Sequence, residues 1–304
     1  MSNPSKDTRR STLFIAVQYL IPQHAISRIV GWAARLENRL VKNLLIRWFI
    51  KHFRVDLSEA TSSRAEDYPS FNGFFTRALR PASRPLPVEP NVLISPVDGT
   101  VSQSGPIEAD RILQAKGQDF LVGELLADER LAEPFHGGAF ATLYLAPYNY
   151  HRIHMPLDGR LLQMLHVPGR LFSVNAASAQ GIPRLFSRNE RVVCLFDTSA
   201  GPMACVLVGA LNVGSIETTW AGEVAPRRGR TVSRWSYDRD SLELARGAEL
   251  GRFNMGSTVI VLFSPGRVAL EQGLRPGETI RMGQPIGRTL FPGRDSLPAT
   301  GIGN

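Results

Sequence analysis

The stretch Phe253-Asn254-Met255-Gly256-Ser257-Thr258-Val259-Ile260-Val261-Leu262-Phe263 decides how the chain is interpreted, because it places a Gly-Ser-Thr triplet directly before an apolar run. The run is short and rich in β-branched residues, which predicts a buried strand over residues 259–263. Glycine at position 256 leaves its carbonyl carbon open and allows strained backbone, so Ser257 could attack the peptide bond that precedes it. For the triplet alone, an ordinary turn at the start of a strand is the favoured interpretation.

The chain is β-rich from residue 92 onward. Glycine and proline separate short apolar runs at 92–94, 140–145, 192–196, 204–210 and 259–263. These frequent turn residues favour a barrel or sandwich over alternating strands and helices. A Pro-x-Asp-Gly pattern recurs at 96–99 and 156–159, a weak internal repeat whose aspartates are also ordinary turn residues. We expect an α+β fold, with N-terminal amphipathic helices followed by a predominantly antiparallel β barrel-like sandwich.

Residues 12–54 differ from the rest, because apolar residues recur there at helical spacing with basic residues between them. The apolar residues are Ile26, Ile29, Val30, Ala33, Leu36, Leu40, Val41, Leu44, Leu45, Trp48 and Phe49, and the basic ones are Arg28, Arg35, Arg39, Lys42, Arg47, Lys51 and Arg54. No apolar run reaches the roughly 18–20 residues that a spanning helix needs. We expect residues 1–54 to lie in a membrane surface with their cations on lipid headgroups. The alternative is a helical hairpin packed on the body, with its basic face in water.

Composition narrows the class of partner. A hydrophobic content of 43% and a charged content of 20% are typical of a globular protein and exclude a disordered one. The 35 Lys+Arg against 27 Asp+Glu give a net charge of +8, which favours nucleic acid or an anionic membrane as partner. The basic residues flank an apolar stripe instead of a base-reading surface, so we expect no nucleic acid partner. Cys194 and Cys205 are expected to be buried free thiols, with a cross-strand disulfide left open.

The remaining boundaries follow from proline and aromatic residues. An aromatic cluster at 71–75 precedes a stretch in which Pro81, Pro85, Pro87 and Pro90 oppose regular structure. We therefore expect residues 55–91 to be a connector that leads to a catalytic β-rich domain at 92–304.

Two of the six histidines, His151 and His154, lie three residues apart. In an extended segment this spacing points them toward nearly opposite faces, where they could serve two different tasks. Two nearby histidines can begin a zinc site, but no HExxH motif or carboxylate–histidine cluster accompanies them, so we expect no metal. For either residue alone, a half-buried structural histidine is the competing interpretation.

Asp98, His154 and Ser257 together could carry nucleophilic chemistry. An aspartate can orient an imidazole, and the imidazole can take the serine proton. A serine hydrolase of lipids or esters is therefore one alternative, although its usual Gly-x-Ser-x-Gly motif is absent from the sequence. A non-catalytic membrane-surface adaptor is another. The residues alone leave open whether Asp98 or Asp158 is the partner of His154.

Several separated segments together resemble the bacterial phosphatidylserine decarboxylase proenzymes, the pyruvoyl-dependent, membrane-associated type. The segments lie at 74–77, 95–99, 150–156, 169–175, 189–191, 214–218 and 255–258. The resemblance runs from about residue 12 to about residue 290. Met255 stands where the family most often has leucine, a swap that conserves volume.

This resemblance implies self-cleavage between Gly256 and Ser257 into a β chain, 1–256, and an α chain, 257–304. Asp98, His154 and Ser257 would act as a charge relay, and Ser257 would become a pyruvoyl group, the covalent cofactor. That group would form a Schiff base with phosphatidylserine and convert it to phosphatidylethanolamine and CO2 during phospholipid biosynthesis. The resemblance assigns His151 to the decarboxylation step, and Ser173 is a candidate for binding the lipid phosphodiester.

The implied partners are phosphatidylserine in an anionic membrane and the protein's own α and β chains as a heterodimer, with further pairing of heterodimers left open. The implied location is the cytoplasmic face of the bacterial inner membrane, with peripheral attachment. The amphipathic segment would hold the site at the headgroup layer, where this lipid presents its amine and carboxylate.

Overall fold

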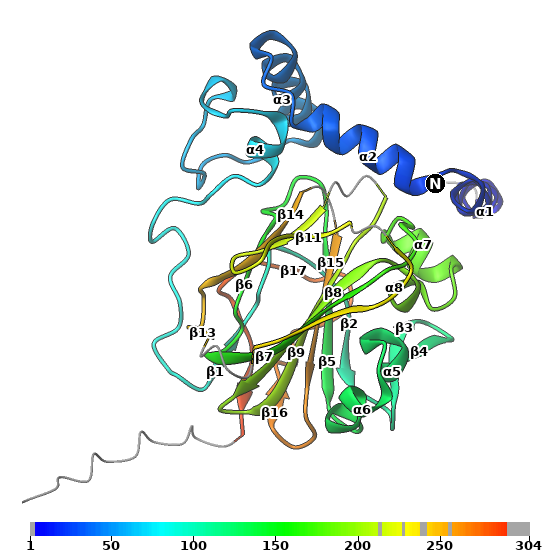
Figure 1. The fold of residues 1–304 in the computed structure, drawn as a ribbon, viewed down its shortest axis with the longest axis vertical. Coiled ribbons are helices and arrows are strands. Elements are labelled where there is room, and N and C mark those ends of the chain that lie inside the picture. The colour runs from blue at the N-terminus through cyan, green and yellow to red at the C-terminus, as the bar shows by residue number, and fades with distance from the viewer. Residues whose placement is uncertain (1–3, 212–214, 227–228, 238–241, 255–256, 291–304) are drawn as a thin grey trace, which may run out of the picture.

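The computed structural model describes residues 4–211, 215–226, 229–237, 242–254 and 257–290, with the backbone alone for 4–10 and 257. The chain begins with three helices, α1 (Pro4–Leu20), α2 (Gln23–Ala34) and α3 (Arg39–Phe53), which lie together over one end of the strand region (Figure 1). Asn38 is the N-cap of α3. Its side chain accepts hydrogen bonds from the backbone N–H groups of Leu40 and Val41, each at 3.1 Å. N-terminal helices are thus confirmed.

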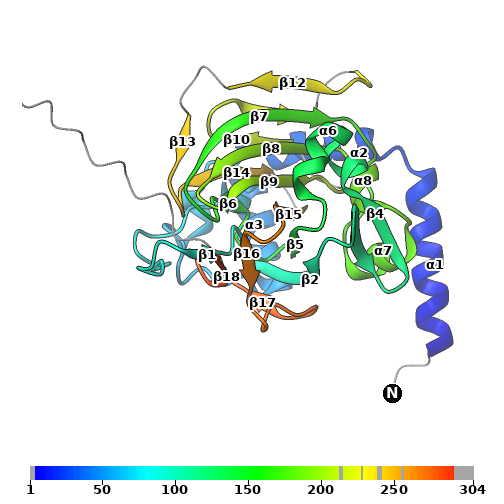
Figure 2. The same ribbon diagram turned by 90° about the horizontal axis from the view of Figure 1, so that it is seen from below.

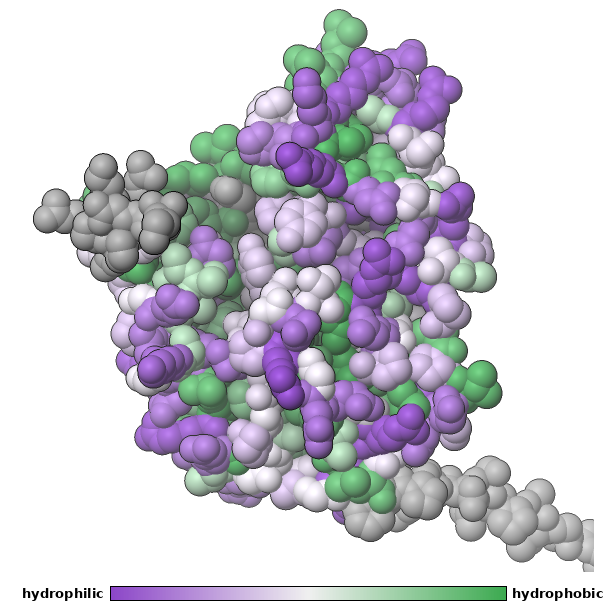
Figure 3. Space-filling model, turned by 180° about the vertical axis from the view of Figure 1, so that it is seen from behind, coloured by the Kyte–Doolittle hydropathy of each residue, from purple (hydrophilic) through white to green (hydrophobic). Residues whose placement is uncertain are grey.

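Large apolar side chains are exposed on these helices. They are Leu13, Phe14, Val17, Leu20, Ile29, Trp32, Leu40, Val41, Leu44 and Trp48. Figure 3 shows hydrophobic residues gathered at this helical end of the molecule. Among the described helices, none is by itself long and apolar enough to cross a membrane, whereas the pair Ser11–Leu20 and Gln23–Ala34, bent by 90°, meets the length and composition limits together.

An aromatic cluster joins α3 to the segment that follows it. This segment contains a 3₁₀ turn, η1 (Ala65–Asp67), and a short helix, α4 (Phe71–Phe75). The Phe49 ring lies 5.1 Å from that of Phe71 and 5.9 Å from that of Phe74, measured between centroids. Residues 76–91 then run down one side of the molecule to β1 (Val92–Ile94) (Figure 1). Part of the expected connector therefore packs on the helices, and the domain boundaries at 54 and 91 stay a prediction.

The largest sheet among the described residues has nine strands. Its order is β12 (Ser233–Ser236), β7 (Gly159–Val167), β8 (Arg191–Thr198), β9 (Gly201–Val208), β15 (Ser257–Phe263), β5 (Ala139–Leu145), β2 (Gly99–Pro106) and β17 (Thr279–Ile280), with β13 (Glu243–Leu244) also paired to β7. Figure 2 shows β7, β8, β9, β15 and β5 as successive neighbours of one curved sheet. Every pairing in it is antiparallel.

Smaller sheets complete the strand region. One contains β11 (Gly222–Ala225), β10 (Ser215–Thr218), β14 (Glu249–Asn254) and β6 (Arg152–His154); another contains β1, β18 (Pro285–Thr289) and β16 (Val268–Leu270); the last pairs β3 (Arg111–Ala115) with β4 (Gln118–Leu121). The short helices are α5 (Val122–Leu126), α6 (Glu129–Ala132), η2 (Glu133–Phe135), α7 (Ala176–Gly181) and α8 (Leu185–Arg188). These antiparallel sheets after the N-terminal helices confirm the predicted fold class.

β15 lies at the centre of the core. Residues 259–262 are 0% exposed, since β5 and β9 pair with β15 on either side and apolar side chains cover both faces. This arrangement explains why the strand is an uninterrupted apolar run instead of an alternating one. The strands predicted at 92–94, 140–145, 192–196, 204–210 and 259–263 are present as β1, β5, β8, β9 and β15. Cys194 and Cys205 face each other across β8 and β9 as buried free thiols.

Gly138 tests how tightly β15 is held. A Cβ added there would lie 2.0 Å from the Phe263 carbonyl oxygen and 2.9 Å from that of Phe135, both backbone atoms. We expect Gly138→Ala to lower the free energy of unfolding by about 2 kcal/mol or more. Gly273→Ala is the matched control, because nothing lies within 4 Å of its added Cβ. Urea unfolding of both variants measures the difference; equal stabilities would contradict the packing described here.

Candidate active site

The Gly-Ser-Thr junction connects two sheets. β14 ends at Asn254 in the four-stranded sheet, and β15 begins at Ser257 in the nine-stranded sheet. The Ser257 backbone pairs with Leu145, and Thr258 pairs with Val208. The predicted cleavage position is Gly256–Ser257; Gly256 and the Ser257 side chain lie outside the described part of the structure. Other predicted residues can be placed relative to this strand start.

His154 is held in one tautomer at the end of β6. Its Nδ1 lies 2.7 Å from the Gly247 carbonyl oxygen, which can only accept, so Nδ1 carries the proton. Its Nε2 therefore accepts from the Tyr150 hydroxyl at 2.9 Å. Burial lowers the pKa of His154, while the Gly247 carbonyl bond opposes the shift. The ring is thus a neutral base whose basic nitrogen faces the Tyr150 hydroxyl.

Asp98 lies close enough to His154 for its charge to favour the protonated imidazole, but its hydrogen bonds go elsewhere. One carboxylate oxygen accepts from Arg84 Nη2 at 2.7 Å, and the other from the Met282 backbone N–H at 2.8 Å. Burial nevertheless raises the pKa of Asp98. Asp158, the alternative partner, instead accepts from the Arg246 backbone N–H at 2.7 Å. The predicted relay of Asp98, His154 and Ser257 stays a prediction.

His151 is completely buried and has one unused nitrogen. Its Nε2 donates to the Ala146 carbonyl oxygen at 3.1 Å, and its ring stacks on Phe75 with centroids 4.0 Å apart. Its Nδ1 has no hydrogen-bond partner among the described residues. Burial, reinforced by the positive charge of Arg77, lowers the pKa of His151 to about 3. The ring is therefore neutral: Nε2 is bonded to the residue that follows Leu145, and Nδ1 carries a lone pair.

A hydrogen-bonded chain holds Asn254, the residue two positions before Gly256. Asn254 accepts from Asn72 Nδ2 of α4 at 2.9 Å and donates through its own Nδ2 to Ser215 Oγ at 2.6 Å. Arg35, at the end of α2, donates to the same Ser215 oxygen at 3.0 Å. The helical end of the molecule is thereby connected to the end of β14, a link that motif spacing does not indicate.

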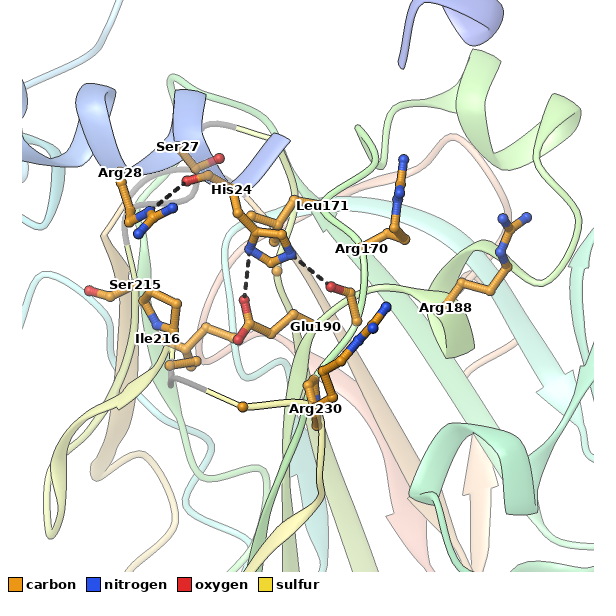
Figure 4. A pocket seen from close by; sticks show the side chains of 16 residues that line it. His24, Ser27, Arg28, Arg170, Leu171, Arg188, Glu190, Ser215, Ile216 and Arg230 are labelled. Carbon is orange, nitrogen blue, oxygen red and sulfur yellow. Dashed lines mark hydrogen bonds and ion pairs between the residues drawn. The ribbon is translucent and has the colours of Figure 1, made fainter. Parts of the chain in front are cut away.

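A cavity of about 830 Å³ opens beside this chain, beneath α2 (Figure 4). Its lining includes Ser215 of β10 and Gly209, the residue after Val208 of β9. Since Val208 pairs with Thr258, the cavity reaches the neighbourhood of the β15 start. Ser173 is not part of the lining: its backbone N–H donates to Gln18 Oε1 of α1 at 2.7 Å, and its binding role stays a prediction.

Sequence reasoning missed several members of the site. Arg84 lies in the proline-rich connector, where no motif marks it. Tyr150 lies in the segment whose two histidines were singled out, and the residues alone gave no reason to single out the tyrosine. Within the described residues, no group of three or more His, Cys, Asp or Glu side chains is arranged to hold a metal ion. The chemistry of the site is thus that of neutral imidazoles, a hydroxyl and a serine at a strand start.

Comparison with known proteins identifies close relatives. A family model described as phosphatidylserine decarboxylase matches residues 71–288, and a second, described as PSD, matches residues 13–54. A phosphatidylserine decarboxylase proenzyme of Methylococcus capsulatus is 51% identical over 276 residues, covering 90% of this chain and 96% of its own. A protein of the same name from Alkalilimnicola ehrlichii is 55% identical over 271 residues, covering 87% and 94%. One from Pseudomonas aeruginosa is 53% identical over 279 residues, covering 90% and 96%.

The state of His151 can be measured directly. Because burial lowers its pKa to about 3, we expect its imidazole to stay neutral, with the proton on Nε2, from pH 8 down to pH 5. Two-dimensional ¹⁵N–¹H NMR of imidazole-labelled protein, assigned with His151→Gln, reports the tautomer and the charge. Titration of this ring with a midpoint near its ordinary value of about 6.5 would contradict the described burial.

Proposed function

Because the chain belongs to the phosphatidylserine decarboxylase family, we propose that it removes CO2 from phosphatidylserine to give phosphatidylethanolamine, through a pyruvoyl group made from Ser257. The observation that carries the proposal is the start of β15. A serine there opens the central strand of the core. Its pairing partner Leu145 precedes Ala146, whose carbonyl holds His151, and His154 belongs to β6, which pairs with β14 just before the junction. The relatives are named proenzymes, which supports processing of this chain into two pieces.

The residues around Ser257 fit a pyruvoyl group. The backbone of β15 is fixed on both sides, so a new terminus at residue 257 would stay in place after cleavage. The unpartnered Nδ1 of His151 provides a buried hydrogen-bond acceptor on the segment that precedes β6. When formed, the pyruvoyl carbonyl would bind the substrate amine and draw electrons from the bond to the departing carboxylate.

Self-cleavage needs a base for the Ser257 hydroxyl, and His154 supports that role. Its lowered pKa keeps the ring neutral at ordinary pH, and its Nδ1–H is fixed by Gly247, so Nε2 is the basic atom. Tyr150 holds that atom in the present state and must either move aside or pass the proton between Ser257 and His154. Asp98 would stabilise the imidazolium by its charge at a distance instead of by direct contact.

His151 is suited to the decarboxylation step. As a neutral ring with a free Nδ1, it can accept a hydrogen bond from the substrate amine and so orient the substrate for loss of CO2. The buried surroundings of the ring favour loss of a charged carboxylate as neutral CO2, because a poorly solvated site stabilises the charge less than water does.

The membrane is the source of the substrate in this proposal. The exposed apolar residues of α1, α2 and α3 lie at the end of the molecule where the cavity opens, which supports peripheral attachment through the helices. We place the enzyme on the cytoplasmic face of the bacterial inner membrane. The predicted α and β chains would remain a heterodimer, since β15 and β18 of the α chain pair with β5, β9 and β1 of the β chain.

Intact mass under denaturing conditions tests the proposal. We expect two chains divided between residues 256 and 257, with the small chain lighter than a serine-started peptide by the loss of ammonia. Ser257→Ala should give one uncleaved chain and no CO2 from phosphatidylserine vesicles. A single chain in wild-type protein that is labelled at Ser257 by a fluorophosphonate would instead indicate a hydrolase, and a single unlabelled chain would favour an adaptor.

Asn254 tests how the cleavage junction is positioned. Asn254→Ala removes the hydrogen bonds to Asn72 and Ser215 without touching the predicted relay. Since the two bonds together contribute about 2 kcal/mol, we expect self-cleavage to slow about thirtyfold. CO2 release per mole of pyruvoyl should stay within about twofold, because the end of β14 has already separated from residue 257. Asn43→Ala on α3 is the matched control, and an Asn254→Ala variant cleaving at the wild-type rate would show that the chain of hydrogen bonds has no positioning role.

A further inference from the structure

The cavity beneath α2 has an unusual balance of charge. Four arginines line it: Arg28, Arg170, Arg188 and Arg230. Glu190 is the one carboxylate among its described lining residues. Among the ion pairs of the described residues, none joins any of these four arginines to a carboxylate. A concave site with several uncompensated guanidinium groups favours an anionic ligand.

Glu190 lies between two histidines of the site. One oxygen accepts from His166 Nε2 at 2.7 Å, and the other lies 4.0 Å from His24 Nδ1. The other nitrogen of His24 lies 2.9 Å from the Gly169 carbonyl oxygen. Figure 4 shows this histidine–glutamate pair in the middle of the cavity. With four arginines against this one carboxylate, the described lining has an excess of positive charge.

The four arginines divide into two pairs. Arg170 Nη2 donates to the Tyr19 carbonyl oxygen at 3.2 Å, and Arg188 Nη1 donates to the Tyr19 hydroxyl at 3.2 Å, so both attach α1 to the body. Arg28 makes one long bond, 3.3 Å, from Nε to the carbonyl of His24 in its own helix, which leaves its Nη atoms for a ligand. Figure 4 shows Arg28 and Arg230 near the His24–Glu190 pair, with Arg170 and Arg188 farther to one side.

The rest of the lining matches a lipid better than a free ion. Pro168, Leu171, Ile216, Ala225 and Pro226 give the cavity apolar walls. Its roof is α2, which turns Ser27 inward and exposes Ile29 and Trp32 by 66% and 67% on the outside. A small hydrated anion gains nothing from apolar walls, whereas a glycerophospholipid has a phosphodiester with apolar groups attached.

We propose that this cavity binds the phosphodiester of an anionic glycerophospholipid between Arg28 of α2 and Arg230 of the loop after β11. The inference rests on the proposed function, for which it supplies the subsite that holds the substrate's phosphate. Ser215 and Gly209 connect the cavity to the ends of β14 and β9, so a headgroup held there can extend its amine toward residue 257. Guanidinium groups suit this task because they present paired donors to phosphate oxygens.

The test measures binding without catalysis. Ser257→Ala protein is titrated with dihexanoylphosphatidylglycerol, which has the phosphodiester but no amine to react, and the dissociation constant is measured by calorimetry. Adding Arg28→Gln or Arg230→Gln should raise that constant about tenfold each, the effect expected for one charge-assisted hydrogen bond. Arg160→Gln is the matched control, because Arg160 pairs with Asp197 at the ends of β7 and β8 that lie away from the cavity.

Each other outcome overturns the proposal. Undetectable lipid binding, or an equal loss in Arg160→Gln, would mean that the cavity holds no such ligand or that only net charge matters. Equally tight binding of dihexanoylglycerol would show an apolar site, and equally tight binding of inorganic phosphate would show a site for a free anion. Unchanged thermal unfolding of the variants excludes misfolding, and Arg230→Lys should bind with intermediate strength. Because the probe is not decarboxylated, wild-type protein that fails to release CO2 would refute the proposed function without affecting this result.

Discussion

Backbone hydrogen bonding along both edges of β15 is the constraint on which the rest of the structure depends. The strand is enclosed by β5 and β9, and its first residue is Ser257. A nucleophile or cofactor at a loop would be free to drift, but the first residue of a central strand inherits the rigidity of the whole sheet. His151 is bonded to Ala146, the residue after the partner of Ser257, and the Asn254 chain holds the end of the strand that leads into it.

The two histidines show how burial can give one residue type two uses. Both rings are neutral because desolvation disfavours the imidazolium, yet carbonyl oxygens select opposite tautomers. The Ala146 carbonyl accepts a hydrogen bond from Nε2–H of His151, and the Gly247 carbonyl accepts one from Nδ1–H of His154. The basic nitrogens therefore differ in position and in neighbour: one is bare, and the other faces the Tyr150 hydroxyl. This difference supports the separate tasks expected from their spacing in the sequence.

The sequence was most informative where side-chain chemistry alone decides the outcome. The β-branched run of β15 and the amphipathic pattern of α2 and α3 predicted their structures, because burial selects those residue types. The choice between Asp98 and Asp158 could not be made from the residues, since both occupy Pro-x-Asp-Gly turns. The two carboxylates differ in their hydrogen-bond donors: Asp158 accepts from the backbone N–H of Arg246, and Asp98 accepts from the side chain of Arg84. Both donors come from distant segments. The partner of His154 is a backbone carbonyl, and a carbonyl is present at every residue, so the sequence carries no signal for it.

The interleaving of strands across residue 256 has a consequence for how the mature protein would persist. If the chain is cut there, the shorter piece supplies the middle of one sheet and the edge of another, and it cannot leave without dismantling the core. Its association would then not depend on protein concentration in the way that ordinary subunit binding does. The unfolded pieces would also lack the tether that brought their strands together, so re-forming β15 between β5 and β9 would become a bimolecular event. The mature enzyme would persist because it unfolds slowly, and efficient folding would be possible only in the uncut precursor.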